Sequence, residues 1–230
     1  MGYLIFRGVS TANLPHVAVA KMPSHKKASK RLTEYYIKGR DGALHVDEGF
    51  ANFNITVQLV LIDATPSTRQ LVNAWADGTG KLISSDDLTK AYKATVEQGI
   101  VWERVKGNTG FYDTATIIFN CQPFIYEATE SSYVFTSSGT LVNPGTDETY
   151  PTIVVEGSGD VTFSVAGQSV TIGNMSSGTS VTLDCENGYV YTPSGALTMV
   201  GDFPVIPIGT SSVNIGNATK LTITPHWRWV

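Results

Sequence analysis

The sequence has no long hydrophobic run, and this absence narrows the class of protein. Its first apolar segment, Tyr3 to Phe6, ends at Arg7, so neither a signal peptide nor a membrane-spanning helix is expected. The Ser or Thr that N-myristoylation needs at position six is missing as well. These features predict a protein that is made in a cytoplasm and has no membrane partner.

Charge is also scarce. Charged residues make up 16% of the 230 residues and hydrophobic residues 42%, which is typical of an ordered globular chain with one large or two small domains. The net charge of −4 is unevenly placed, because the chain up to Ile125 has 14 Lys and Arg against 11 Asp and Glu, and the rest has 2 against 9. Three excess cations are too few to predict a nucleic-acid-binding face.

Only two cysteines are present, Cys121 and Cys185. Each lies in an alternating, strand-like run, where a small buried thiol is a commoner outcome than a disulfide. The four histidines are not spaced as metal ligands are, and no pair of closely spaced cysteines is present to supply further ligands. We therefore expect no metal site.

Motifs of catalytic, phosphate-binding and dinucleotide-binding sites occur only in part. Four Gly-x-Ser segments lack the closing glycine of a nucleophile elbow, and Asp77 to Leu82 departs from a phosphate-binding loop at both ends, which favours a helix end and turn. Gly157-Ser158-Gly159 lacks the third glycine of a dinucleotide motif and is interpreted as a hairpin turn. Asp47-Glu48 and Asp86-Asp87 lie in turn-like stretches, where such acids are usually solvated. We expect no catalytic residue and no cofactor site.

The first half predicts a sheet covered by one helix. From Phe53 to Leu61 every odd position is apolar, which indicates a half-buried strand. Thr65 and Pro66 offer an N-cap and a first-turn proline ahead of apolar residues at helical spacing, and Gly78 is expected to end that helix. Further strands are predicted over residues 81–84, 92–96 and 111–121.

An extended hairpin is predicted between the early strands and Phe53. Residues 23–31 carry five Lys, Arg or His and little to bury, so they form an exposed arm or loop. A strand-like segment, Leu32 to Lys38, turns at Gly39 to Gly42 and continues through Val46, which places the hairpin at about 32–53.

Composition shifts after Tyr126 to Ser, Thr and Gly, and Asn143-Pro144-Gly145-Thr146 is interpreted as a linker and turn region. Short alternating apolar segments then recur between turn glycines, as in a β-sandwich. We predict a mainly β fold: an α+β N-terminal domain over 1–128 with one helix and an extended hairpin, and a C-terminal β-sandwich over 129–230. Its last strand, 220–230, can pack back on the first domain.

The strongest alternation in the second half lies near its end. Apolar and polar residues alternate from Leu221 to Trp229, so Trp227 and Trp229 share a face with Leu221. Aromatic rings can stack on sugars, but such a clean separation predicts that both indoles are buried.

A set of short motifs follows one order along nearly the whole chain. In the first half they are Gly39-Arg40-Asp41-Gly42, Lys81-Leu82-Ile83, Ala91-Tyr92-Lys93-Ala94 and Phe119-Asn120-Cys121-Gln122-Pro123. In the second half they are Asn143-Pro144-Gly145, Tyr150-Pro151-Thr152-Ile153, Gly157-Ser158-Gly159, Phe203-Pro204, Pro207-Ile208-Gly209 and Pro225-His226-Trp227-Arg228-Trp229. Together they resemble the distal tail protein family of bacteriophages and prophages with long non-contractile tails, mostly of Gram-positive hosts. The segment from Pro207 to Val213 departs from the tighter proline-glycine turn of the family.

This resemblance implies a structural protein of the phage tail tip, or baseplate, and no enzyme. It implies a homo-hexameric ring closed through a belt hairpin, with Lys38, Gly39, Arg40, Asp41 and Gly42 as the candidate ring interface. A galectin-like or carbohydrate-module-like sandwich would lie outside the ring. The implied partners are the tail tube protein, the tail-tip hub protein and receptor-binding proteins, while DNA only passes through the lumen. The protein would assemble in the host cytoplasm and reside in the virion.

Two other classes remain open. A carbohydrate-binding module or adhesin would act through the C-terminal β-sandwich, and the first half of the chain would only support that domain. A tail-associated hydrolase would need catalytic residues, for which the sequence offers no pattern.

Overall fold

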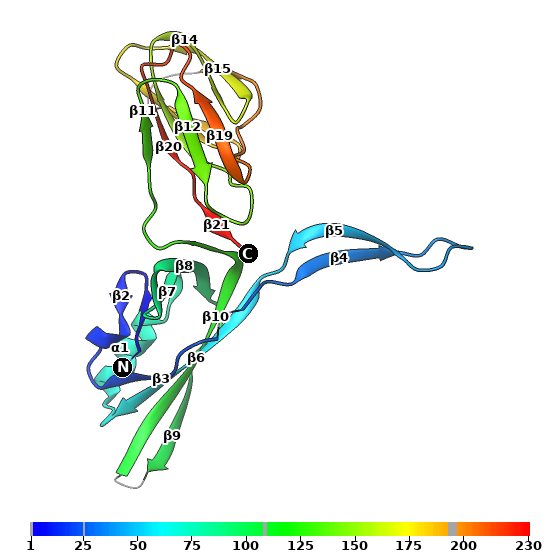
Figure 1. The fold of residues 1–230 in the computed structure, drawn as a ribbon. Helices are drawn as coiled ribbons and strands as arrows, with labels where there is room; N and C mark the ends of the chain where they lie inside the picture. Colours follow the sequence, from blue (N-terminus) through cyan, green and yellow to red (C-terminus); the bar gives the residue numbers. More distant parts are fainter. Residues whose placement is uncertain (1, 25, 108–109, 193–196) are drawn as a thin grey trace. The chain divides into compact units, whose positions relative to one another are not determined.

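A computed structural model describes residues 2–24, 26–107, 110–192 and 197–230 (Figure 1). The chain divides into two compact units, an N-terminal unit of Met1–Ala128 with Val230 and a C-terminal unit of Thr129–Trp229. Strands dominate both units, and α1 (Pro66–Trp75) is the one α-helix of the described residues. The predicted mainly β fold is confirmed.

One antiparallel sheet forms the body of the N-terminal unit. Its strands follow the order β2-β1-β7-β8-β10-β6-β3, and β9 also pairs with β10. Their bounds are β1 Leu4–Phe6, β2 Val9–Ser10, β3 Val17–Lys21, β6 Phe53–Ile62, β7 Gly78–Ser84, β8 Asp87–Val96, β9 Val101–Gly107 and β10 Gly110–Glu127, with a 3-10 turn over Thr11–Asn13. Strand β10 is long enough to pair with β6 on one side and with β9 and then β8 on the other.

The periodicity of β6 sets the inner face of this sheet. Its odd positions Ile55 to Leu61 are buried and the even positions point outward, as predicted. The apolar core against this face also contains three aromatic rings that pack edge to face. The ring centroids of Phe6 and Phe119 are 5.0 Å apart, and those of Trp75 and Phe119 are 6.0 Å apart. Edge-to-face aromatic packing adds to the free energy of burial, so this cluster joins α1 to the sheet.

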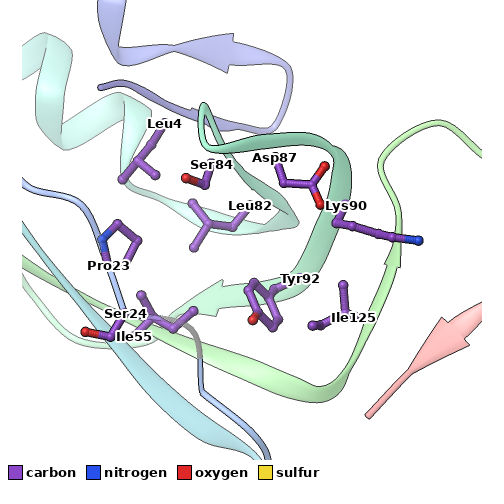
Figure 2. A pocket seen from close by; sticks show the side chains of 10 residues that line it. All are labelled: Leu4, Pro23, Ser24, Ile55, Leu82, Ser84, Asp87, Lys90, Tyr92 and Ile125. Carbon is purple, nitrogen blue, oxygen red and sulfur yellow. The ribbon is translucent and has the colours of Figure 1, made fainter. Parts of the chain in front are cut away.

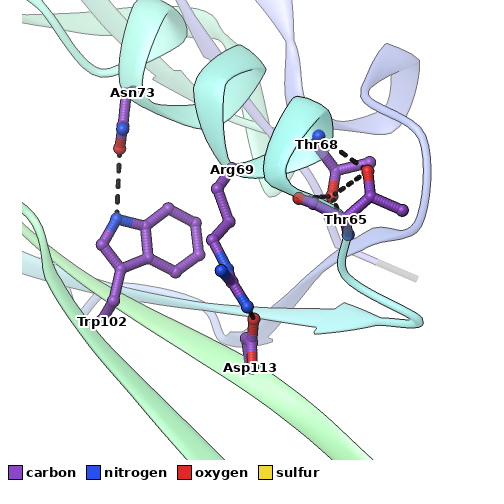
Figure 3. A network of polar contacts seen from close by, with 6 residues as sticks. All are labelled: Thr65, Thr68, Arg69, Asn73, Trp102 and Asp113. Atoms are coloured by element: carbon purple, nitrogen blue, oxygen red, sulfur yellow. Dashed lines mark hydrogen bonds and ion pairs between the residues drawn. The ribbon is translucent and has the colours of Figure 1, made fainter.

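Helix α1 begins where the sequence predicts. Thr65 is the N-cap and Pro66 the first residue, and Thr65 and Thr68 form a reciprocal capping box (Figure 3). Two polar contacts tie the helix to the sheet: Arg69 Nε donates to Asp113 Oδ2 at 2.7 Å, and Trp102 Nε1 donates to Asn73 Oδ1 at 3.2 Å.

The end of α1 differs from the prediction. The helix ends at Trp75, and Gly78 is already the first residue of β7, with a φ of +76°. The expected helix end and turn over Asp77 to Leu82 is therefore wrong, because Gly78–Ser84 pairs with β8 as a strand.

The predicted hairpin exists as a separate two-stranded sheet of β4 (Lys30–Tyr35) and β5 (Leu44–Phe50), which we call the arm. Its first strand ends at Tyr35, three residues before the predicted end at Lys38, and residues 36–43 form the tip. Lys30 and Arg31, expected in a loop, begin β4. His25 lies outside the described residues.

The C-terminal unit is a β-sandwich of two five-stranded sheets, ordered β11-β20-β13-β16-β17 and β12-β19-β14-β15-β18. The strands are β11 Tyr133–Phe135, β12 Gly139–Asn143, β13 Thr152–Glu156, β14 Gly159–Val165, β15 Gln168–Met175, β16 Ser180–Asp184, β17 Tyr189–Tyr191, β18 Thr198–Val200, β19 Gly209–Asn214 and β20 Lys220–Thr224, followed by β21 Arg228–Trp229. The inner faces of both sheets bury one apolar core, which includes Ile153, Phe163 and Trp227.

Two local predictions in this unit are wrong. The Ser-, Thr- and Gly-rich stretch after Tyr126, expected to be a linker, holds β11 and β12, and only residues 144–146 of the expected turn lie outside a strand. Asn143 ends β12 and is buried, and its Oδ1 accepts from Gly145 N at 2.8 Å. Gly157-Ser158-Gly159 does not close a hairpin, because β13 and β14 belong to different sheets. The turn therefore carries the chain from one sheet to the other.

The predicted continuous strand from Leu221 to Trp229 is broken. Strand β20 ends at Thr224, and His226 has a left-handed φ of +55°. Trp227 is nevertheless buried, as predicted, whereas Trp229 is only half-buried and its Nε1 donates to Pro144 O at 3.2 Å.

Candidate functional site

The five residues singled out by the sequence lie together at the tip of the arm. Lys38, Gly39, Arg40, Asp41 and Gly42 are all exposed. Gly39 and Gly42 have φ values of +85° and +77°, which L side chains rarely adopt, and Arg40 N donates to Ile37 O at 3.1 Å. The glycines therefore shape the turn, and the charged side chains between them face solvent.

The arm has one charged face. Glu34 stands opposite His45 and Leu32 opposite Asp47, and residues that face each other in an antiparallel pair lie on the same side. Lys30 forms an ion pair with Asp47, and His45 Nδ1 lies 3.6 Å from Glu34 Oε1. The Lys30 hydrogen bond lowers the pKa of the Asp47 carboxyl.

The opposite face of the arm carries uncovered apolar side chains beside Thr33 and Glu48, whose side chains are hydrogen-bonded to each other. Tyr35 stands opposite Leu44, and Thr33 opposite Val46. The exposed fractions of Tyr35, Leu44 and Val46 are 55%, 40% and 47%. The sequence shows that residues 44 and 46 point to the same side of their strand, and so do residues 33 and 35. Only the pairing register shows that all four residues lie on one face of the arm.

A cavity in the N-terminal unit is the second candidate site (Figure 2). Its volume is about 80 Å³ and its walls are mainly apolar, with Leu4, Ile55, Leu82 and Tyr92 among them. Burial raises the pKa of the Tyr92 phenol. Because pockets for drug-sized ligands have volumes of roughly 300–1,000 Å³, this cavity has room for only a few water-sized groups.

Within the described ranges no three His, Cys, Asp or Glu side chains gather as a metal site would require. Cys121 and Cys185 are free and buried, as predicted, and burial raises the pKa of each thiol to about 12. Asp47 belongs to strand β5, and the predicted acidic turn holds only for Asp86, which precedes β8.

The described segments of the chain contain no helix of the length and hydropathy needed to cross a membrane.

The two-unit β architecture is shared with solved structures of phage proteins. The distal tail protein (Dit) of phage SPP1, described as a paradigm of the hub adsorption apparatus in phages that infect Gram-positive hosts, superimposes with a TM-score of 0.75 over 100% of both chains at 15% identity. Chains of the phage p2 baseplate in its activated conformation match with TM-scores of 0.51 with Sr and 0.52 with Ca, at 8% and 10% identity. These matches cover 97% and 96% of this chain, and 97% of each p2 chain.

No protein-family model and no curated protein matches the sequence. The chain has the Dit fold over its full length, and the resemblance seen in the sequence is confirmed at the level of the fold.

Proposed function

We propose that this chain is a structural subunit of a phage tail tip and that six copies close into a ring through the arm. The ring would join the tail tube protein to the tail-tip hub protein and present receptor-binding proteins. The Dit fold over the full chain supports this role, together with an arm whose apolar face is uncovered. The protein would have no enzymatic activity, and it would assemble in the host cytoplasm and remain in the virion.

The uncovered arm carries the proposal. An isolated two-stranded hairpin is only marginally stable in water, so an arm that keeps Tyr35, Leu44 and Val46 exposed on one face gains stability by docking. Fully burying a side chain of this size contributes about 1.5–3 kcal/mol, so covering the remaining exposed half of all three contributes roughly 2–4 kcal/mol per arm.

A closed ring also requires two different complementary surfaces on every copy, since each contact is heterologous. The arm of one copy would supply the first surface, and a site on the neighbouring copy would supply the second. Each copy has a net charge of −4, so the ring is acidic as a whole, and passing DNA would not be held by phosphate contacts.

The test places a charge on the apolar face of the arm. Leu44→Asp should leave a folded protein that no longer forms rings, because a carboxylate at a docked apolar site would lose its hydration. Leu88→Asp is the matched control, since Leu88 is 50% exposed on the body of the N-terminal unit and Leu44 is 40% exposed. Replacing Lys38 to Leu44 by a glycine-serine loop tests the tip in the same way.

Light scattering at high protein concentration and negative-stain imaging with the tail tube protein give the readout. Rings of the wild type and of Leu88→Asp, with none for Leu44→Asp, support the proposal. A wild-type chain that stays monomeric or dimeric even with the tail tube protein would refute the ring, and rings formed by Leu44→Asp would refute the arm as its contact.

A further inference from the structure

The outer face of the sheet β11-β20-β13-β16-β17 presents two exposed tyrosines on its edge strand. Tyr189 and Tyr191 are each 67% exposed, while Val190 between them packs against the sandwich core. Successive side chains of a strand point to opposite faces, so both rings leave the outer face together. Their positions along the strand are about 6.6–6.8 Å apart, from a rise of about 3.3–3.4 Å per residue.

Polar side chains continue this face beside the two rings. Asp184 stands opposite Tyr189, and Thr182 opposite Tyr191, on the neighbouring strand. One strand further, Thr152 stands opposite Asp184. Directly opposite residues have Cβ atoms roughly 4.5–5.5 Å apart, so the hydroxyls and the carboxylate lie within reach of a molecule that rests on the tyrosines.

Hydrogen bonds hold the polar groups in place. Asn187 Nδ2 donates to Asp184 Oδ2 at 2.8 Å, and Asn187 N donates to Oδ1 at 3.0 Å. Thr152 Oγ1 lies 2.9 Å from His226 Nε2, and His226 Nδ1 lies 3.1 Å from Glu130 Oε2. The Asn187 side-chain hydrogen bond lowers the pKa of Asp184, so this carboxylate stays ionised and acts as an acceptor.

The combination matches the chemistry of a sugar chain. A pyranose ring has apolar C–H groups on its faces and hydroxyls around its edge, so it binds where an aromatic face adjoins hydrogen-bonding groups. Two rings spaced along one strand can contact successive units of an oligosaccharide. Beyond Ile125 the chain has 2 Lys and Arg against 9 Asp and Glu, a charge that disfavours an anionic glycan.

We propose that this face binds a neutral glycan, with Tyr189 and Tyr191 as the stacking platform and Asp184, Thr182 and Asn187 as hydrogen-bonding groups. A stable protein interface would bury about 800 Å² per partner around an apolar centre, whereas the neighbours of the tyrosines here are Thr and Asp. The site is independent of ring closure, because all of its residues belong to the C-terminal unit.

The test uses the full 230-residue chain and a panel of neutral hexasaccharides of glucose, galactose and N-acetylglucosamine, with polyglycerol phosphate as the anionic comparison. Saturation-transfer NMR and isothermal titration calorimetry measure binding. At least one neutral hexasaccharide should bind, and Tyr189→Ala and Tyr191→Ala should each weaken it by about tenfold, the effect of about 1.4 kcal/mol. Tyr189→Phe should retain most of the affinity, because it keeps the stacking face.

Val142→Ala is the control for an exposed residue outside the site, since Val142 lies on β12 of the opposite sheet and is 57% exposed. It should bind like the wild type, and thermal melts should show all four variants folded. The proposal is overturned if no neutral member of the panel binds, if polyglycerol phosphate binds more tightly than the neutral sugars, or if both alanine variants bind as tightly as the wild type.

Discussion

Trp227 offers the sharpest test of how the C-terminal sandwich is held together. Its side chain is 1% exposed within the apolar core, and its ring lies edge to face with Tyr133 at a centroid separation of 6.2 Å. Truncating a buried Phe or Trp to Ala costs about 3–5 kcal/mol, because the transfer free energy is lost and a cavity remains. A domain holds only about 5–15 kcal/mol in total.

Trp227→Ala should therefore lower the melting temperature of the C-terminal unit by roughly 12–40 °C, since 1 kcal/mol corresponds to about 4–8 °C in a domain of this size. Differential scanning calorimetry of the purified chain gives the measurement. Trp229→Ala is the matched control: Trp229 is half-buried, so its loss should cost only about 1–2 kcal/mol.

An unchanged melting temperature for Trp227→Ala would refute this reasoning. If the same variant also lost affinity for a glycan, the indole would have to be a sugar platform, and the tyrosine face would not be the binding site.

The remaining predictions concern local chemistry. Cys121 and Cys185 should resist iodoacetamide at pH 8 in the folded protein and react once it is unfolded, as followed by mass spectrometry, because burial raises both pKa values from 9.0 to about 12. Since the unfolded thiols lose their protons first, stability should fall as the pH rises above about 9; native-state alkylation would contradict both statements. Thr65→Ala should lower the stability of the N-terminal unit by about 1 kcal/mol in a denaturant titration, and Thr65→Ser should restore it, because the capping oxygen returns. Equal stability of Thr65→Ala and the wild type would show that the capping box contributes nothing.

Several elements could be predicted from the sequence because their causes are local. The alternation of β6 places Ile55 to Leu61 on one face whatever the strand pairs with, and Thr65 with Pro66 marks the start of α1 through backbone groups one turn away. Gly39 and Gly42 likewise determine the turn of the arm through their own φ values.

The exposed apolar residues of the candidate assembly surface could not be predicted from the sequence. The sequence located the tip, Lys38 to Gly42, but the apolar groups left exposed for docking include Tyr35, Leu44 and Val46. Their alternation resembles that of any half-buried strand. It cannot tell whether a second layer covers them, because burial depends on segments far away along the chain.

In the C-terminal unit, too, the sequence determines which side chains share a face, and the tertiary structure decides which of them are buried. Alternation by itself determined that Trp227 faces the same side as Leu221 and that Tyr189 and Tyr191 share a face. Only the tertiary structure decided that the tryptophan is buried between two sheets and that the tyrosines are left on an uncovered edge strand. It also decided that Tyr133–Phe135 and Gly139–Asn143 form strands of the sandwich. The physical reason is that the side-chain period is a property of neighbouring residues, whereas exposure is decided by which distant strands pack against them.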